Sequence, residues 1–303
     1  MNRIPVSIII VSFNTKALLR NCLQSIYEQT QNLEFEVIVS DNGSKDGSVE
    51  MVRNEFPQVY LVENKENLGF GKGNNRGLDV AKGKCVFYLN SDTLLLNNAV
   101  KIFFDCWTKL PENVGAIGCN LVDADGKPTE SYGSFPQSKK MVKAMFRHMI
   151  AFYVKNVMKF FHKDISKLRP VPVYKQRFGE VDYVTGADLF MTNDENARYD
   201  ESFFLYFEET DMQWRLRKKG KVSMIVEGPK IQHLIRGGGK RVDDVIRYGS
   251  FSIIQSEISR VRYAKKNLSP MAAFLLKIMI SVQWLSPYIF KNTRKFYKVL
   301  WGI

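Results

Sequence analysis

The sequence is poor in the residues that build structural metal sites and disulfide frameworks. It contains four cysteines and three histidines in 303 residues. The cysteines (Cys22, Cys85, Cys106 and Cys119) show no metal-ligand spacing and lie within apolar runs. Such cysteines are typical of reduced, buried thiols, which persist in a cytoplasmic compartment. The cysteine pattern therefore excludes a disulfide-rich secreted class and favours a cytoplasmic protein.

Long uninterrupted apolar runs are also missing. The first apolar run, Val6–Val11, is too short for the core of a signal peptide, and polar turn residues follow it at once. Residues 272–290 approach the length of a membrane span but contain Lys277, Gln283 and Pro287. A spanning helix needs about 20 mostly apolar residues, so we expect this segment to form an interfacial helix.

Positive charge is unevenly distributed along the chain. The formal net charge is +13, yet residues 1–138 carry −3 and residues 179–211 carry −9. Residues 139–178 carry +10 and residues 212–303 carry +15. Such basic blocks suit an anionic surface or partner, although a solvated helix face gives the same composition. No helix-turn-helix, zinc or RNA-binding pattern accompanies the charge, which argues against a nucleic-acid partner.

Strand and helix signals alternate through the first 122 residues. Strands are predicted by β-branched and aromatic runs at Val6–Ser12, Phe35–Ser40, Val59–Val62, Cys85–Leu89 and Val114–Val122, with helical segments between the first four. This alternation predicts an α/β fold with a mostly parallel sheet. Ligands bind such sheets beyond the carboxyl ends of the strands. The segments at those ends, Ser12–Thr15, Asp41–Ser44 and Asn90–Thr93, are all polar.

Each of these polar segments supports two interpretations. Asp92, just after a buried strand, is suited to coordinating Mg²⁺ or Mn²⁺, and Asn90 to bonding a ribose hydroxyl. Asp41 is suited to accepting a hydrogen bond from a pyrimidine ring. In isolation, each segment is better explained as an Asx turn that ends a strand. The glycine cluster Gly71, Gly73 and Gly77 has GxGxxxG spacing, and the first strand–helix turn lacks glycine, which together exclude a dinucleotide site.

The order of these segments is more informative than any one of them. Ser-Phe-Asn-Thr at 12–15 is followed by Asp-Asn-Gly-Ser at 41–44, by Asn67–Gly77 and by Leu-Asn-Ser-Asp-Thr at 89–93. The order resembles family 2 glycosyltransferases of the GT-A fold, especially the bacterial rhamnosyltransferase-like branch. The resemblance covers about residues 5–235 and continues through Thr185–Ala187, Phe207–Arg217 and His233.

The resemblance implies a role for each matching position. Asp41 would contact the nucleobase, Asn90 the ribose, and Asp92 the Mn²⁺ or Mg²⁺ ion that holds the diphosphate. His233 would bind the same cation or the diphosphate, unless it is a structural histidine. The remaining implied donor-binding residues are Ser12, Phe13, Asn14, Asn42, Gly69, Lys72, Asn74 and Ser91; the implied acceptor-side residues are Gly186, Trp214 and Arg215.

The catalytic base departs from the family pattern. Family members usually carry Glu-Asp at the start of the acceptor-side helix, and the aspartate deprotonates the acceptor hydroxyl. This chain has Glu208-Glu209, so Glu209 takes the place of that aspartate and moves the carboxylate by about one C–C bond. Asp211 is the alternative base. The whole acidic cluster is also explained by N-terminal capping of a helix.

The sequence therefore predicts an inverting, metal-dependent transfer of rhamnose or another hexose. The donor is expected to be a dTDP- or UDP-sugar and the acceptor a saccharide, lipid-linked, in cell-surface polysaccharide biosynthesis. The alternatives are a UDP-hexose-specific enzyme and a catalytically silent homologue that only binds partners. Residues 1–238 would form the catalytic domain, with a basic helical insert at about 139–178. Residues 239–303 would form a helical tail that holds the protein on the inner face of the membrane or makes a homodimer contact.

Overall fold

The computed structural model describes residues 4–161, 173–234, 251–284 and 293–303. The chain divides into two compact units. Unit 1 comprises residues 1–135, 174–204 and 208–236, and unit 2 comprises residues 136–173, 205–207 and 237–303. The basic insert thus shares a unit with the C-terminal helices. The predicted boundary at residue 238 lies outside the described residues.

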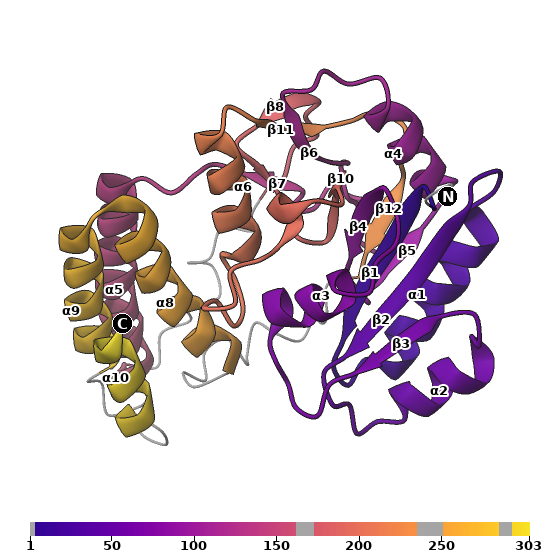
Figure 1. Cartoon of the computed structure of the whole chain (residues 1–303). Helices are drawn as coiled ribbons and strands as arrows, with labels where there is room; N and C mark the ends of the chain where they lie inside the picture. Colours follow the sequence, from indigo (N-terminus) through magenta and orange to yellow (C-terminus); the bar gives the residue numbers. More distant parts are fainter. Residues whose placement is uncertain (1–3, 162–172, 235–250, 285–292) are drawn as a thin grey trace. The chain divides into compact units, whose positions relative to one another are not determined.

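Unit 1 is built on a mostly parallel sheet (Figure 1). Within the described residues its strand order is β3-β2-β1-β4-β10-β6-β11-β8. The strands are β1 (Val6–Ser12), β2 (Phe35–Asp41), β3 (Tyr60–Glu63), β4 (Cys85–Leu89), β6 (Val114–Gly118), β8 (Gly179–Val181), β10 (Asp188–Thr192) and β11 (Val222–Ile225). Strand β10 runs antiparallel between β4 and β6, and β8 runs antiparallel to β11. The predicted α/β class is confirmed.

Helices cover both faces of this sheet, because alternate residues of each buried strand point to opposite sides. Ile8 and Ile10 of β1 pack with α1 (Lys16–Gln29), α2 (Ser48–Glu55) and α4 (Ala99–Trp107). Ile9, between them, packs with α3 (Phe70–Leu78) and α6 (Glu208–Lys218). The near-continuous apolar strands therefore form the middle layer of a three-layer unit.

Two small sheets bring distant segments to the carboxyl edge of the main sheet. Strand β12 (Ile231–His233) pairs antiparallel with β5 (Thr93–Leu95), so that His233 lies opposite Thr93. Strand β7 (Tyr132–Gly133) pairs with β9 (Tyr183–Val184). Both pairs place residues from the second half of unit 1 beside segments of the first half.

The predicted end of the fifth strand is wrong. Strand β6 ends at Gly118 and not at Val122, because the next N–H, that of Cys119, donates to the Asp188 carboxylate over 2.7 Å and leaves the ladder. The described part of the predicted basic helical insert contains one long helix, α5 (Ser138–Phe160).

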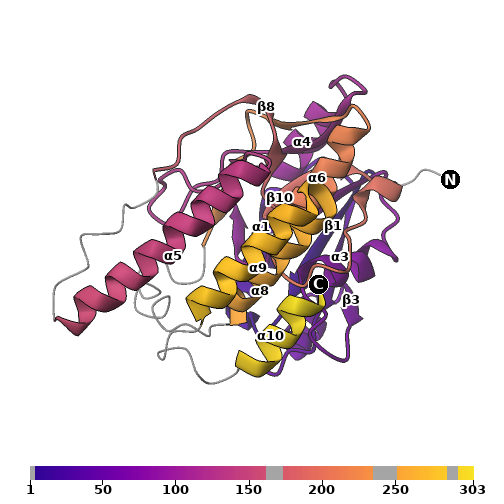
Figure 2. The same cartoon turned by 90° about the vertical axis from the view of Figure 1, so that its left-hand side faces the viewer.

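Unit 2 is helical. Helix α5 packs with α8 (Phe251–Tyr263), α9 (Pro270–Trp284) and α10 (Thr293–Gly302) around a core that includes Met145, Phe152, Leu276 and Leu300 (Figure 2). Among the described residues, no helix combines the length and apolarity needed to cross a bilayer.

Candidate active site

The loops after β1 and β2 are tied to each other by side chains predicted to bind the donor. The N–H of Asn14 donates to Ser44 Oγ over 2.8 Å, and the Asn14 side-chain oxygen accepts the N–H of Lys45. Asn14 adopts a φ of 53°, a left-handed conformation that asparagine tolerates better than most residues. Ser12 is fully buried, and Phe13 beside it is 40% exposed. The first predicted segment therefore forms one rigid edge with the second.

Asp41 and Asn42 are buried at the end of β2. The two oxygens of the Asp41 carboxylate accept the N–H and the hydroxyl of Ser44, at 2.8 and 2.7 Å. The Asn42 amide donates to the carbonyl of Gly69 over 2.9 Å. These bonds make the segment an Asx-type turn as well as a candidate nucleobase contact. The nucleobase role of Asp41 stays a prediction.

The glycine cluster serves close packing of α3 against the sheet and its neighbours. A Cβ at Gly77 would lie 2.5 Å from the side chain of Ile9, and one at Gly73 would lie 3.0 Å from Val11. Gly69 begins the helix at a φ of 83° and would clash with the carbonyl of Phe204 if it had a Cβ. Close packing and the positive φ of Gly69 explain why glycine is required at these positions, without a phosphate ligand.

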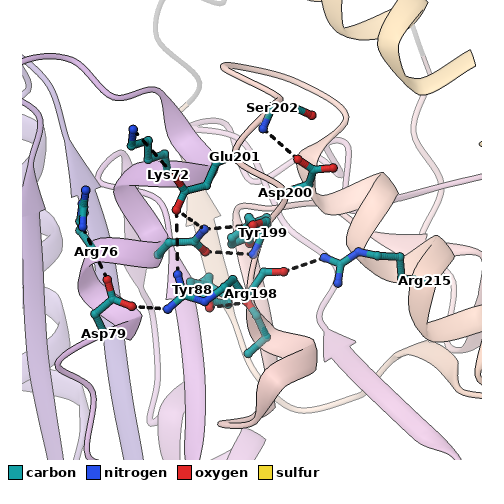
Figure 3. Close-up of polar contacts among 12 residues, drawn as sticks. Lys72, Arg76, Asp79, Tyr88, Arg198, Tyr199, Asp200, Glu201, Ser202 and Arg215 are labelled. Carbon is teal, nitrogen blue, oxygen red and sulfur yellow. Dashed lines mark hydrogen bonds and ion pairs between the residues drawn. The ribbon is translucent and has the colours of Figure 1, made fainter. Parts of the chain in front are cut away.

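Two residues predicted to bind the donor in α3 have protein partners. Lys72 forms an ion pair with Glu201 over 3.9 Å (Figure 3). The Asn74 amide donates to the carbonyl of Phe70 within its own helix. Their donor-binding roles therefore stay predictions that no contact here favours.

Asn90, Asp92 and His233 do come together. His233 Nε2 lies 3.3 Å from Asp92 Oδ1 and 3.4 Å from the side-chain nitrogen of Asn90. The β5–β12 pair holds this arrangement, since the N–H of Leu234 donates to the carbonyl of Asp92 over 2.8 Å. The other ring nitrogen of His233 is buried and makes no hydrogen bond within the described part of the chain. Ser91, between Asn90 and Asp92, is also buried.

Glu209 lies in the first turn of α6, facing Gly186. A Cβ at Gly186 would lie 3.2 Å from the Phe70 ring and 3.7 Å from Glu209 Cβ. Burial raises the pKa of Glu209 to about 7, and the nearby Glu130 carboxylate also raises it. Burial, followed by Glu209, raises the pKa of Glu208 well above its usual range. Two adjacent carboxyls thus have raised pKa values, and that of Glu209 lies near neutrality.

Sequence reasoning assigned no role to Glu130. Its charge raises the pKa of Glu209 and of Tyr183, and His233 partly offsets the rise that burial causes in the pKa of Glu130. Glu130 follows a loop and belongs to no recognisable motif, so no signal in the sequence indicates this influence.

Two residues predicted to lie on the acceptor side contact other residues of the protein. Arg215 contacts Asp211 over 3.3 Å. It also donates to the carbonyl of Arg198 over 2.6 Å (Figure 3). Trp214 packs edge-on against Phe135 at 4.9 Å between ring centroids. The Trp214 indole N–H is buried and meets no acceptor among the described residues. An acceptor role is thus better supported for Gly186, beside Glu209, than for Arg215.

The backbone before α6 is strained. Tyr206 and Phe207 adopt φ values of 71° and 70°, which cost non-glycine residues about 1–3 kcal/mol each. Such conformations cluster at functional sites, and these two residues immediately precede Glu208 and Glu209.

Comparison with known proteins decides the family. The sequence pattern described as "Glycosyl transferase family 2" matches residues 7–165, which is more than half of the chain. The chain belongs to glycosyl transferase family 2. It is 39% identical over 97 residues to the uncharacterized glycosyltransferase YfnE of Bacillus subtilis, a match that covers 31% of this chain and 24% of that relative.

Another relative matches over a longer range. The N-acetylglucosaminyl-diphospho-decaprenol L-rhamnosyltransferase of Mycobacterium tuberculosis is 24% identical over 241 residues, 75% of each protein. This glycosyltransferase is therefore rhamnosyltransferase-like in sequence, as the order of its motifs predicted.

Solved structures share the fold. A mannosyltransferase from Pyrobaculum calidifontis, in complex with GDP-Man and Mn²⁺, aligns with a TM-score of 0.52 at 16% identity, covering 99% of this chain and 85% of that one. GalNAc-T7 with UDP, GalNAc and Mn²⁺ aligns with a TM-score of 0.62 at 14% identity, covering 99% and 54%. The glycosyltransferase therefore has the predicted GT-A fold.

Proposed function

We propose that this glycosyltransferase transfers a sugar, rhamnose or another hexose, with inversion from a nucleoside-diphosphate sugar to a saccharide acceptor. The observation that carries the proposal is Glu209, a carboxyl with a pKa of about 7 beside Gly186, in the same unit as the Asp92–His233 pair. The acceptor is lipid-linked and belongs to cell-surface polysaccharide biosynthesis. The decaprenol-linked substrate in the name of the mycobacterial relative supports this part.

In the proposed reaction Glu209 takes the proton of an acceptor hydroxyl as its oxygen attacks the anomeric carbon. The nucleoside diphosphate leaves from the opposite face, so a single displacement inverts the configuration. Asp211 is less suited to this step, because its side chain is fully buried against Arg215, whereas Glu209 is partly exposed. Burial, followed by the charge of Glu209, raises the pKa of Glu208 well above its usual range, which disfavours a second negative charge beside Glu209.

A divalent cation fits the Asp92–His233 pair. One carboxylate oxygen and one imidazole nitrogen face each other over 3.3 Å, and both are ligands for Mn²⁺. The described residues contain no group of three acidic, histidine or cysteine ligands, so the donor diphosphate must supply further oxygens. When bound, the cation offsets the charge that develops on the departing diphosphate.

Replacing the base tests the reaction. We expect Glu209→Gln to lower kcat by about 10²–10⁴-fold and to leave the affinity for the nucleotide nearly unchanged, because the amide cannot accept the proton. Asp211→Asn is the matched control and should retain most of the turnover. Full activity of Glu209→Gln together with an inactive Asp211→Asn would transfer the role to Asp211.

The pH profile tests the same residue independently. Since Glu209 acts as a base only when it is deprotonated, kcat/KM should rise with pH up to about 7 and level off above it. Measuring kcat/KM from pH 5.5 to pH 9 at constant ionic strength tests this rise. A profile that is flat down to pH 5.5 would contradict an assignment to Glu209.

Metal dependence is tested at Asp92. Chelation by EDTA should abolish transfer, and added Mn²⁺ or Mg²⁺ should restore it. Asp92→Asn should weaken the Mn²⁺-dependent part of nucleotide binding at least tenfold, because a neutral amide replaces a charged ligand. Calorimetric titration of UDP, dTDP and GDP, with and without Mn²⁺, gives this value and also identifies the nucleotide. An unchanged metal response in Asp92→Asn would place the cation elsewhere.

A further inference from the structure

Unit 2 contains an apolar groove of about 680 Å³ between α5 and α9. Its walls are formed by Val142, Phe146, Met271, Ala272, Leu275 and Met279. Apolar grooves of this size are large enough to hold a hydrocarbon chain. The groove lies wholly within unit 2 and shares no residue with the candidate active site.

Exposed apolar side chains continue along both helices that border the groove. On α5, Phe146, Ile150 and Val154 recur every fourth residue and are 46–50% exposed. On α9, Met271, Phe274, Leu275, Ile278 and Val282 are 38–65% exposed. The opposite faces of the same helices, with Met145 and Leu276, form the core of unit 2. Each helix therefore has apolar residues on two faces, of which only one is used for folding.

The two exposed stripes lie along one seam. The groove joins the first turns of α5 to the first turns of α9, and farther along the Tyr153 hydroxyl donates to the carbonyl of Val282 over 2.5 Å. Helices α5 and α9 therefore run side by side in the same direction (Figure 2). We call this strip the α5–α9 seam, defined by the groove residues and by Ile150, Val154, Ile278 and Val282. Phe274 lies outside it, because its ring packs edge-on against Trp301 of α10.

The surroundings of the seam are basic. Lys139 and Lys143 line one end of the groove. In the described parts of unit 2 (136–161, 205–207, 251–284 and 293–303), the sequence has fourteen lysines and arginines and one acidic residue, Glu257. Glu257 is buried and lies 3.7 Å from Arg260. The unit thus presents apolar side chains among positive charges that no surface carboxylate of its described residues offsets.

This combination selects among the possible occupants. A second copy of the chain would bring an equally basic surface against this one, and like charges would repel. A nucleic acid would match the charge but would leave the apolar stripes exposed to water. An anionic bilayer matches both, since its phosphates attract lysines and its acyl chains cover apolar side chains.

We infer that the α5–α9 seam docks on an anionic phospholipid bilayer, with an acyl chain in the groove and lipid phosphates on Lys139 and Lys143. The inference rests on the proposed function in one respect, because it assigns a surface to the membrane where the lipid-linked acceptor resides. It moves the expected membrane contact from the C-terminal tail alone to a face shared by the insert and the tail.

Vesicle binding by the full chain tests the seam. The double variant Lys139→Glu/Lys143→Glu should bind vesicles of phosphatidylglycerol and phosphatidylcholine at least roughly 30-fold more weakly than the unsubstituted protein. Lys82→Glu/Lys109→Glu, which reverses two exposed lysines of unit 1, changes the net charge equally and should bind normally. Flotation with pure phosphatidylcholine vesicles gives the baseline for both.

The contribution of the apolar side chains of the seam is tested by substitutions at exposed positions, where they affect folding least. Leu275→Gln should weaken binding, whereas Leu96→Gln, which changes a somewhat more exposed leucine of unit 1, should not. In a Phe146→Trp variant, bromine atoms on the acyl chains should quench fluorescence beyond the quenching of the unsubstituted protein. Equal quenching, or unchanged vesicle binding by both seam variants, would overturn the inference.

Two further outcomes would also overturn it. Dimers that Leu275→Gln dissociates without loss of vesicle binding would assign the seam to a second copy. Oligonucleotide binding that the lysine variant abolishes, with vesicle binding retained, would assign it to a nucleic acid. Transfer to a water-soluble acceptor is measured in parallel. If the unsubstituted protein catalyses no such transfer, the proposed function is contradicted. If the seam variants retain this transfer but bind vesicles weakly, the seam serves membrane docking and not catalysis.

Discussion

Asp188, at the start of β10, is a fully buried carboxyl that the proposed reaction does not use. One of its oxygens accepts the N–H of Cys119 over 2.7 Å, and the other meets no hydrogen-bond donor within the described residues. Burial raises the pKa of Asp188 to about 8. The residue is therefore protonated at neutral pH in the folded chain and ionised in the unfolded chain.

This difference gives folding stability a pH dependence. Between about pH 4 and pH 8 the folded state holds a proton that the unfolded state has lost, so the free energy of unfolding falls as pH rises. Asp188→Asn should remove a slope of up to about 1.4 kcal/mol per pH unit, since asparagine keeps an oxygen for Cys119 and does not titrate. Urea unfolding at pH 5, 6.5 and 8 measures this, with Asp125→Asn, an exposed site, as control. Parallel curves for the Asp188→Asn variant and the unsubstituted protein would refute the assignment.

Single residues differ in how far the sequence predicted them. Asp92 and His233 were expected at one cation, and they lie 3.3 Å apart. Their proximity was predictable because each belongs to an ordered motif. Glu130 and Asp188 belong to none. Asp188 is distinguished by its burial and Glu130 by charged neighbours distant in the sequence, neither of which a single sequence reveals.

Among the elements, α6 is fixed to β9 by one side chain. The Gln213 oxygen accepts the N–H of Val184 over 2.7 Å, and its amide nitrogen donates to the carbonyls of Val184 and Glu209. The Gln213 amide thus completes hydrogen bonds that an adjacent strand would otherwise supply. It holds the first turn of α6, and with it Glu209, against the strand that leads to Gly186.

Removing this link should destabilise the fold and impair catalysis. Gln213→Leu keeps the volume but leaves both backbone groups of Val184 buried without that partner, which should cost about 2–4 kcal/mol of unfolding free energy. Gln24→Leu, at an exposed position of α1, is the control and should change stability little. Below the unfolding transition, kcat of Gln213→Leu should fall more than the affinity for the nucleotide, because Glu209 loses its orientation. An equal loss of both would indicate general loosening of unit 1.

Element types were more predictable than element ends. The alternation of apolar strands and amphipathic helices predicted the three-layer unit, and the paired strands confirm it. Strand β6 ended early because Asp188, far along the chain, takes the N–H of Cys119. The spacing of the α3 glycines excluded a dinucleotide site but gave no reason for the cluster, and Gly73 and Gly77 are required by close packing on β1. In both places a tertiary contact decides what the local pattern leaves open.

At the scale of the whole molecule, charge follows the two units. The insert and the C-terminal region were recognised as separate basic blocks, and their shared core of apolar residues, including Met145 and Leu276, was not. The sequence could not predict that core, because both segments are helical and periodicity does not say which amphipathic helices pack together. Once they are seen as one unit, its described residues (136–161, 205–207, 251–284 and 293–303) carry fourteen basic residues and one acidic residue.

This partition of charge predicts how salt affects activity. Attraction between unit 2 and an anionic bilayer is screened over about 10 Å at 0.1 M salt and about 3 Å at 1 M. Raising NaCl from 50 to 500 mM should therefore lower the rate of transfer to a vesicle-embedded, lipid-linked acceptor at least roughly tenfold. Transfer to a water-soluble acceptor should change less than about twofold, because Glu209 and Asp92 lie in unit 1 and act at short range. If salt slowed transfer to the lipid-linked and to the water-soluble acceptor equally, the positive charge of unit 2 would affect the transfer reaction itself and not the binding of the protein to the membrane.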